Sequence, residues 1–200
     1  MLDIANNMSS AAWPDVQSTK LDAARRQLET AISMLFSGGD AISTHTLAFA
    51  AFGILKDVAA HRGANSVLAA AAALAAAGKK GEFWKGFNRA GNFFKHADRD
   101  PDAVLVGMPE EENEALISIA LAIYDGLGCI KSTELQTFSL WWSCINFQGV
   151  DDVEEPFMSW LSANQGRLHA DTRNELLELG QELLHLLKNK PAPASGRSDA

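Results

Sequence analysis

The chain has 200 residues, of which 47% are hydrophobic and 21% charged, and its formal net charge is −8. This length and composition suit one globular domain that can form a core without disulfides. The negative charge argues against a protein that coats nucleic acid or anionic membranes nonspecifically. Alanine is abundant while threonine and tyrosine are sparse, so the composition favours helices over strands.

The N-terminal part predicts two helices joined by a short turn. After a lead-in at residues 1–17, apolar residues recur at helical spacing from about Ser18 to Phe36, where Gly38-Gly39 ends the helix. Asp40 can cap a second helix that runs to about residue 61 and is apolar around much of its circumference. Because few residues separate the two helices, we expect a long antiparallel hairpin.

Further helices follow along the chain, and no segment shows the alternation of a strand. Pro109 suits the first helical position of the helix that starts near residue 110. The sequence therefore predicts an all-α bundle of seven to eight helices in one domain, 18–190, with a tail at 191–200 of disorder-type composition. The helices expected after the hairpin are 66–77, 81–96, 110–127, 132–147, 151–163 and 171–188.

The helix at 81–96 carries the most informative polar face of the chain. At 100° per residue, Arg89, Asn92 and His96 fall within about 60° of one another, and Lys85 joins them. Phenylalanines, Phe94 among them, occupy the opposite face. The surrounding stretch 79–99 holds six cations and two acids, whereas residues 100–200 hold six cations and seventeen acids. This face is therefore the candidate site, in the one cationic part of an acidic protein.

These residue types suit phosphate chemistry. Arg89 is a permanent cation that can grip a phosphodiester, and His96 can exchange protons near neutral pH. A cation and an imidazole are the minimum for metal-free RNA cleavage, in which the imidazole moves protons and the guanidinium offsets charge on phosphorus. The alternative is a solvated helix face in which Arg89 or His96 is bonded to Asp98 or Asp100.

His45 is the second histidine of interest, because it lies early in the most apolar helix. A lone histidine there is most often an interior residue bonded to a hydroxyl or carbonyl. If it faced the polar side of the 81–96 helix, it would bring a second imidazole to one cavity, as a small-molecule enzyme could use. No combination of histidines, cysteines and acids has metal-type spacing, so the sequence predicts no metal and no other cofactor.

The segment from Arg89 to His96 resembles the Arg-x(4–6)-His signature of the HEPN superfamily of small all-α proteins. The resemblance covers residues 18–127 and leaves 128–190 as C-terminal helices without a counterpart. It implies a homodimer that binds RNA at the protomer interface and cleaves it without metal, with Arg89 stabilising the phosphate and His96 as general acid/base. Many members lack nuclease activity and serve as binding modules. Ala90 stands where the family commonly has a polar residue.

Around the site that this resemblance implies, we expect Lys85, Asn92 and Lys95 to contact the substrate, with His45 as an additional candidate. Cys129 and Cys144 are isolated, and the N-terminus has no secretory signal, which indicates a reduced, cytoplasmic protein. The longest apolar run is too short to span a membrane. Two functions stay open at this point: an RNA-binding protein that can also cleave RNA, and a non-catalytic helical interaction or dimerisation protein. The sequence does not decide whether the protein is an enzyme.

Overall fold

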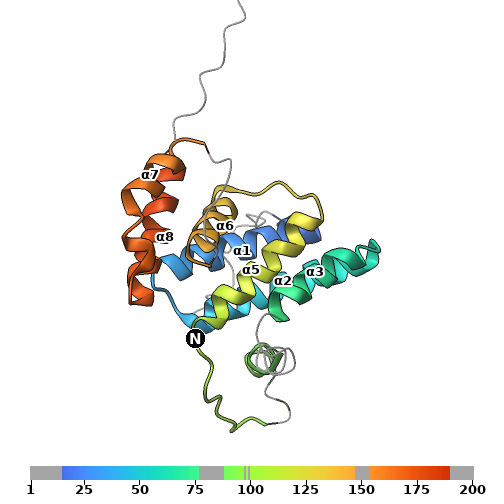
Figure 1. Cartoon of the computed structure of the whole chain (residues 1–200). Coiled ribbons are helices and arrows are strands. Elements are labelled where there is room, and N and C mark those ends of the chain that lie inside the picture. Colours follow the sequence, from blue (N-terminus) through green and yellow to red (C-terminus); the bar gives the residue numbers. More distant parts are fainter. Residues whose placement is uncertain (1–14, 77–87, 97, 99, 147–153, 190–200) are drawn as a thin grey trace, which may run out of the picture.

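The structure is a computed structural model of the chain, and Figure 1 shows its arrangement. Every regular element in the described part of the chain is helical, which confirms the predicted all-α fold. The described residues form seven α-helices, one 3-10 turn and a short helical segment at 88–93. The described residues are 15–76, 88–96, 98, 100–146 and 154–189.

The first two helices form the predicted hairpin. Helix α1 spans Lys20–Phe36 and helix α2 spans Ala41–His61. The side chains of Thr19 and Asp40 each accept a hydrogen bond from the backbone N–H three residues later, at 3.1 and 2.7 Å, and so cap the two helices. Gly38 has φ +66°, a left-handed conformation that favours glycine, and it lets the chain reverse between them.

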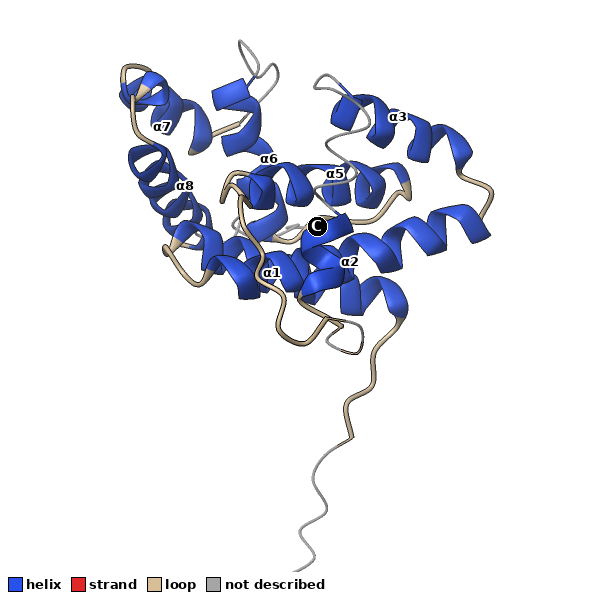
Figure 2. Cartoon of the chain, turned by 90° about the horizontal axis from the view of Figure 1, so that it is seen from below, coloured by secondary structure: helices blue, strands red, loops and turns tan. Residues whose placement is uncertain are grey.

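Helix α2 has the central position that its apolar sequence indicates. It packs against α1, against α5 (Glu112–Gly126) and against α3 (Asn65–Ala76). In Figure 2, α3 lies at one end of the molecule, and the last two helices lie at the other. Helices α3 and α5 approach closely, because a Cβ added to Gly126 would lie 2.5 Å from the side chain of Val67.

The three C-terminal helices share the core of the hairpin. They are α6 (Thr133–Asn146), α7 (Phe157–Asn164) and α8 (Arg173–Lys188), and both α6 and α8 pack against α1. Trp141 is 1% exposed, and its indole Nε1 donates a hydrogen bond of 2.6 Å to the Leu176 carbonyl of α8. The C-terminal part is thus fastened to the N-terminal hairpin through one apolar core.

Several predicted helix limits are corrected. Helix α5 begins at Glu112, because Pro109 starts a turn, in which its carbonyl accepts a bond of 3.1 Å from the Glu112 N–H, rather than the helix itself. Helix α7 begins at residue 157, and the three described residues before it, 154–156, are not helical, since Pro156 disfavours helical geometry in the residue that precedes it. The helix expected to reach His96 ends at residue 93 and continues as a turn.

Some predictions fall outside the described residues. They concern the lead-in up to residue 14, the stretch 77–87 with Lys85, the helix limits expected at 147 and 151, and the tail from 190 onward. None of the helices in the described part of the chain is both long and apolar enough to cross a membrane.

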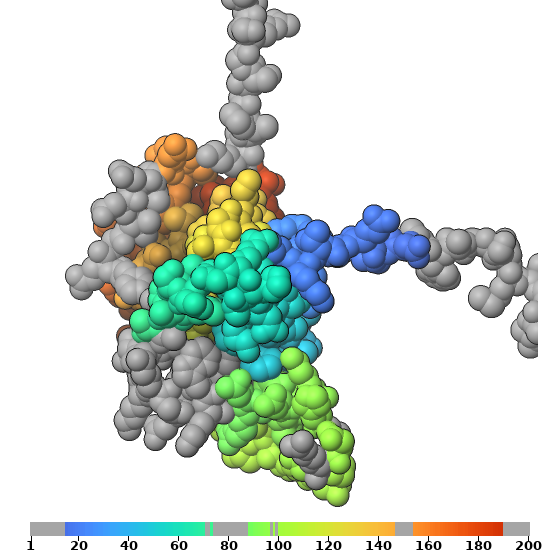
Figure 3. Space-filling view, turned by 90° about the vertical axis from the view of Figure 1, so that its right-hand side faces the viewer, coloured from blue at the N-terminus to red at the C-terminus, as the bar shows by residue number. Residues whose placement is uncertain are grey.

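The helical segment 88–93 and the loop after it project from the body of the molecule beside α2, as Figure 3 shows. The segment docks closely on α2, because a Cβ added to Gly91 would lie 2.6 Å from the Phe49 ring. The Phe94 ring meets the His45 ring edge-on at 5.7 Å, and the Lys95 ammonium lies 4.5 Å from the centre of the Phe49 ring. These contacts fix which face of the segment points outward.

Candidate functional site

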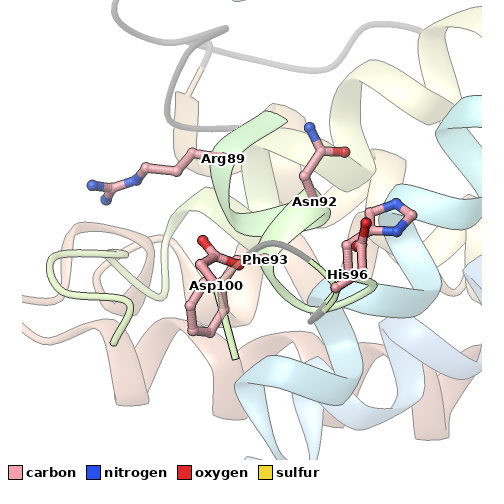
Figure 4. A pocket seen from close by; sticks show the side chains of 6 residues that line it. Arg89, Asn92, Phe93, His96 and Asp100 are labelled. Carbon is pink, nitrogen blue, oxygen red and sulfur yellow. The ribbon is translucent and has the colours of Figure 1, made fainter. Parts of the chain in front are cut away.

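A hollow of about 590 Å³ lies on the outward face of the segment, and we call it the Arg–His hollow. Apart from the half-buried Phe93, the side chains that line it are exposed. Three residues predicted to share one helix face therefore line one hollow, together with two acids and an aromatic ring (Figure 4). Its lining comprises Arg89, Asn92, Phe93, His96, Asp98 and Asp100.

His96 lies on the same face as Arg89 and Asn92, although the helical segment ends at residue 93. The His96 N–H donates a hydrogen bond of 3.1 Å to the Asn92 carbonyl, which is the i to i−4 pattern of a helix. The early end of the helix thus leaves the imidazole on the side that helical spacing predicts.

The Arg89 guanidinium is held by the backbone of the loop that follows the segment. Its Nη2 donates to the carbonyl of Val106 at 2.9 Å and to that of Gly107 at 3.4 Å. Within the described residues, no ion pair joins Arg89 or His96 to a carboxylate. The carbonyls orient the guanidinium without neutralising it, so its charge can still attract an anion.

The guanidinium of Arg89 and the imidazole of His96 lie at different ends of the hollow. In Figure 4 the Arg89 and His96 side chains extend in opposite directions from the backbone, and Asp100 lies between them in this view. The field of Arg89 also reaches the start of α5, where burial raises the pKa of Glu112 and Arg89 acts in the opposite direction. One copy of the chain therefore offers a cation and a proton-transfer group at separate positions.

Site residues that the sequence prediction missed are Phe93, Asp98 and Asp100. Helical spacing offers both acids only as ion-pair partners of Arg89 or His96, yet among the described side chains they line the same hollow without pairing with either. Their position directly after His96 was the available signal. The hollow thus combines one guanidinium with two carboxylates, which is not the charge pattern of a simple phosphate site.

His45 has a different environment from His96. It is 0% exposed, and its Nδ1 lies 3.0 Å from the Oδ1 of Asn113, whose Nδ2 donates to the Ala41 carbonyl at 3.1 Å. Burial lowers the pKa of His45, the bond to Asn113 opposes this shift, and the charge of Lys95 adds to it. Since the amide oxygen is an acceptor, the Nδ1 of His45 carries a proton and donates this bond, as expected of an interior histidine. It does not line the Arg–His hollow.

Of the three residues predicted to contact substrate, only Asn92 is placed in the hollow by the described part of the structure. Lys95 extends over the Phe49 ring on the docking side of the segment, and Lys85 falls in the undescribed stretch. Asn92 lines the hollow.

A second polar cluster joins α8 to α5. Arg173 donates through Nε to Glu114 at 2.7 Å and through Nη1 to Glu110 at 2.9 Å. Glu114 is 7% exposed, and burial raises its pKa while Arg173 acts to lower it. Sequence reasoning missed this cluster because its members are far apart along the chain. This cluster holds α8 against the start of α5, and its three side chains bond to one another. The Arg–His hollow is therefore the better candidate for binding a ligand.

Comparisons with known proteins assign no relationship to this chain. No family model matches it, and neither a curated protein nor a solved structure matches it. Among the residues that the structure describes, no group of three histidine, cysteine or acidic side chains could hold a metal ion.

Proposed function

We propose that the protein binds single-stranded RNA in the Arg–His hollow and cleaves it without a metal. The observation that carries the proposal is that one hollow is lined by an exposed imidazole and by a guanidinium that pairs with no carboxylate among the described residues. The guanidinium offsets the charge of a phosphodiester, and an imidazole can accept a proton on one ring nitrogen and donate one from the other. The resemblance to the HEPN signature supports the same assignment to Arg89 and His96.

The proposed reaction is an internal transesterification. The ribose 2′-oxygen attacks the adjacent phosphorus and loses its proton to a base, the bond to the 5′-oxygen breaks, and that oxygen gains a proton. The products are a 2′,3′-cyclic phosphate and a free 5′-hydroxyl. His96 is the residue that moves a proton, and Arg89 stabilises the charge that develops on the phosphoryl oxygens.

A homodimer is part of this proposal. Because Arg89 and His96 extend in opposite directions, a second copy related by a two-fold axis would supply the imidazole that faces the first copy's guanidinium. Sedimentation of the pure protein tests this directly. We expect a species of twice the chain mass of 21.5 kDa, and RNA cleavage by a monomer would exclude a composite site.

The test of the whole proposal is cleavage of labelled single-stranded RNA in EDTA by the purified full chain. We expect the His96→Ala variant to lose at least about 100-fold in rate, which is the lower range for removing a general acid/base. His61→Ala is the matched control, because His61 is also exposed but ends α2 outside the hollow. Equal rates for wild type and His96→Ala would overturn the catalytic role.

One observation favours a second function, that of a non-catalytic interaction protein. Val104 and Val106 are 81% and 72% exposed on the loop that holds Arg89. Exposed aliphatic side chains close together on a loop suit a protein contact. In that case Val104→Ser with Val106→Ser would weaken self-association or partner binding, and His96→Ala would change no chemistry.

A further inference from the structure

The two carboxylates are the unexplained part of the Arg–His hollow. Asp98 and Asp100 are exposed, line the hollow, and form no ion pair with any described side chain. A carboxylate offers acceptor oxygens only and has no hydrogen to donate. Beside a phosphate they would weaken binding by repulsion. A ligand that fits the whole hollow must therefore offer an anionic group to Arg89 and hydrogen-bond donors to the acids.

A nucleotide unit of RNA has both features, and the hollow has space and a ring for it. Its volume of about 590 Å³ lies within the range of small-ligand sites. Phe93 is half-buried, so its ring is held by the protein while its accessible part faces the hollow. Unpaired bases stack on such rings and present their Watson–Crick edges to polar side chains.

The bases differ in what they offer a carboxylate. Guanine presents two adjacent donors, N1–H and N2–H, which match the two oxygens of one carboxylate. Adenine and cytosine place a ring nitrogen acceptor beside their amino group, and uracil places its single N–H between two carbonyls. An acceptor facing a carboxylate is repelled, and each unmade or repulsive contact costs affinity.

We infer that Asp98 and Asp100 make the hollow selective for guanine in single-stranded RNA, by accepting hydrogen bonds from its N1–H and N2–H. This inference rests on the proposed RNA binding and adds a base preference to it. The phosphate next to that guanine meets Arg89, and the base stacks on Phe93. The acids are then specificity residues, and they take no part in moving the proton.

Binding of 2′-O-methyl octamers to the full chain in EDTA tests this, because such octamers cannot undergo the internal attack. The probes are octa-uridine with one central guanine, the same octamer with inosine or adenine there, and octa-uridine itself. Inosine keeps N1–H and lacks the 2-amino group. We expect the guanine octamer to bind about tenfold tighter than the inosine octamer, and tighter still than the others.

The variants separate base recognition from general charge. In Asp98→Asn with Asp100→Asn the ratio of guanine to inosine affinity should fall to about one, even if the lost negative charge tightens binding of every octamer. Asp102→Asn is the control, because Asp102 is exposed on the same loop and does not line the hollow; its ratio should stay at the wild-type value.

Two failures can be told apart. Wild-type protein that binds all octamers with equal affinity would overturn the guanine preference and leave the proposed RNA binding standing. Wild-type protein that binds none of them would overturn both.

Discussion

The two histidines His45 and His96 lie on opposite sides of the same short segment and have opposite environments. His45 is fully buried, bonded to Asn113 and in contact with the Phe94 ring. His96, two residues beyond Phe94, is exposed in a hollow that also contains a guanidinium. The same residue type therefore serves packing on one side of the segment and is available for chemistry on the other. The role of each histidine depends on the side of the segment on which it lies. Its burial and its hydrogen bonds show which side that is.

The largest expected difference between the two histidines is the effect of replacing each one on the rate of RNA cleavage. His96→Ala should lower the RNA cleavage rate at least about 100-fold and leave the free energy of unfolding within about 0.5 kcal/mol of wild type. His45→Gln should do the reverse, with lower stability and a wild-type rate per folded molecule. Parallel urea unfolding and cleavage assays measure both. Loss of cleavage in a folded His45→Gln protein would place both imidazoles in one site.

The next effect concerns the buried amide that joins α5 to α2. Asn113→Ala removes the partner of the His45 ring nitrogen and of the Ala41 carbonyl, so a buried and a partly buried polar group each lose a hydrogen bond. We expect the free energy of unfolding to fall by about 2–4 kcal/mol. Asn174→Ala, at an exposed position in α8, is the control and should stay within about 0.5 kcal/mol. Equal urea midpoints for the two variants would contradict the importance of the buried network.

Much of the fold follows from local signals. The hairpin limits were predicted within two residues, because Thr19 and Asp40 cap helices whose apolar spacing is regular and Gly38 ends the first. The start of α5 was wrong, since Pro109 suits a helix start and a preceding turn equally well. The sequence cannot distinguish these, because the choice depends on how the loop packs.

The candidate site could be predicted only in part, because only its helical portion follows from a local signal. Helical spacing alone placed Arg89, Asn92 and His96 on one face, and they line one hollow. The contribution of Asp98 and Asp100 depends on how the chain turns after the helix, and spacing says nothing about that. Long-range partners such as Asn113 for His45, 68 residues apart, have no local signal.

A pair of glycines tests how the segment is held against α2. Gly91→Ala would place a Cβ 2.6 Å from the Phe49 ring, whereas Gly53→Ala meets no atom within 4 Å. Since alanine favours helix by about 1 kcal/mol, Gly53→Ala should raise the unfolding free energy by up to that amount. Gly91→Ala should lower it by about 1–2 kcal/mol through overpacking. Urea unfolding gives both values, and stabilisation by Gly91→Ala would show that the docking is loose.

The smallest effect is a pH dependence of stability that belongs to His45. Burial lowers its pKa in the folded state, so the unfolded state, with an ordinary value of about 6.5, binds more protons in acid. The free energy of unfolding should therefore fall as the pH drops below about 6.5, by at most about 1.4 kcal/mol per pH unit.

The control for this prediction is the difference between wild type and His45→Gln. Burial raises the pKa values of Glu112 and Glu114, so these acids oppose the trend on acidification in both proteins and cancel in the difference. The difference in unfolding free energy should shrink from pH 7.5 to 5.5. A difference that stays constant over this range would show that His45 keeps an ordinary pKa.

The central claim is that RNA occupies the Arg–His hollow, and an amide-resolved NMR titration of the full chain with the guanine-containing 2′-O-methyl octamer tests it most directly. We predict that the largest shifts fall on the backbone amides of Arg89, Asn92 and His96, which line the hollow, while the backbone amides of α1 stay unchanged. Shifts confined to other surfaces, such as the groove between α5 and α6, or no shifts at saturating octamer, would contradict the claim.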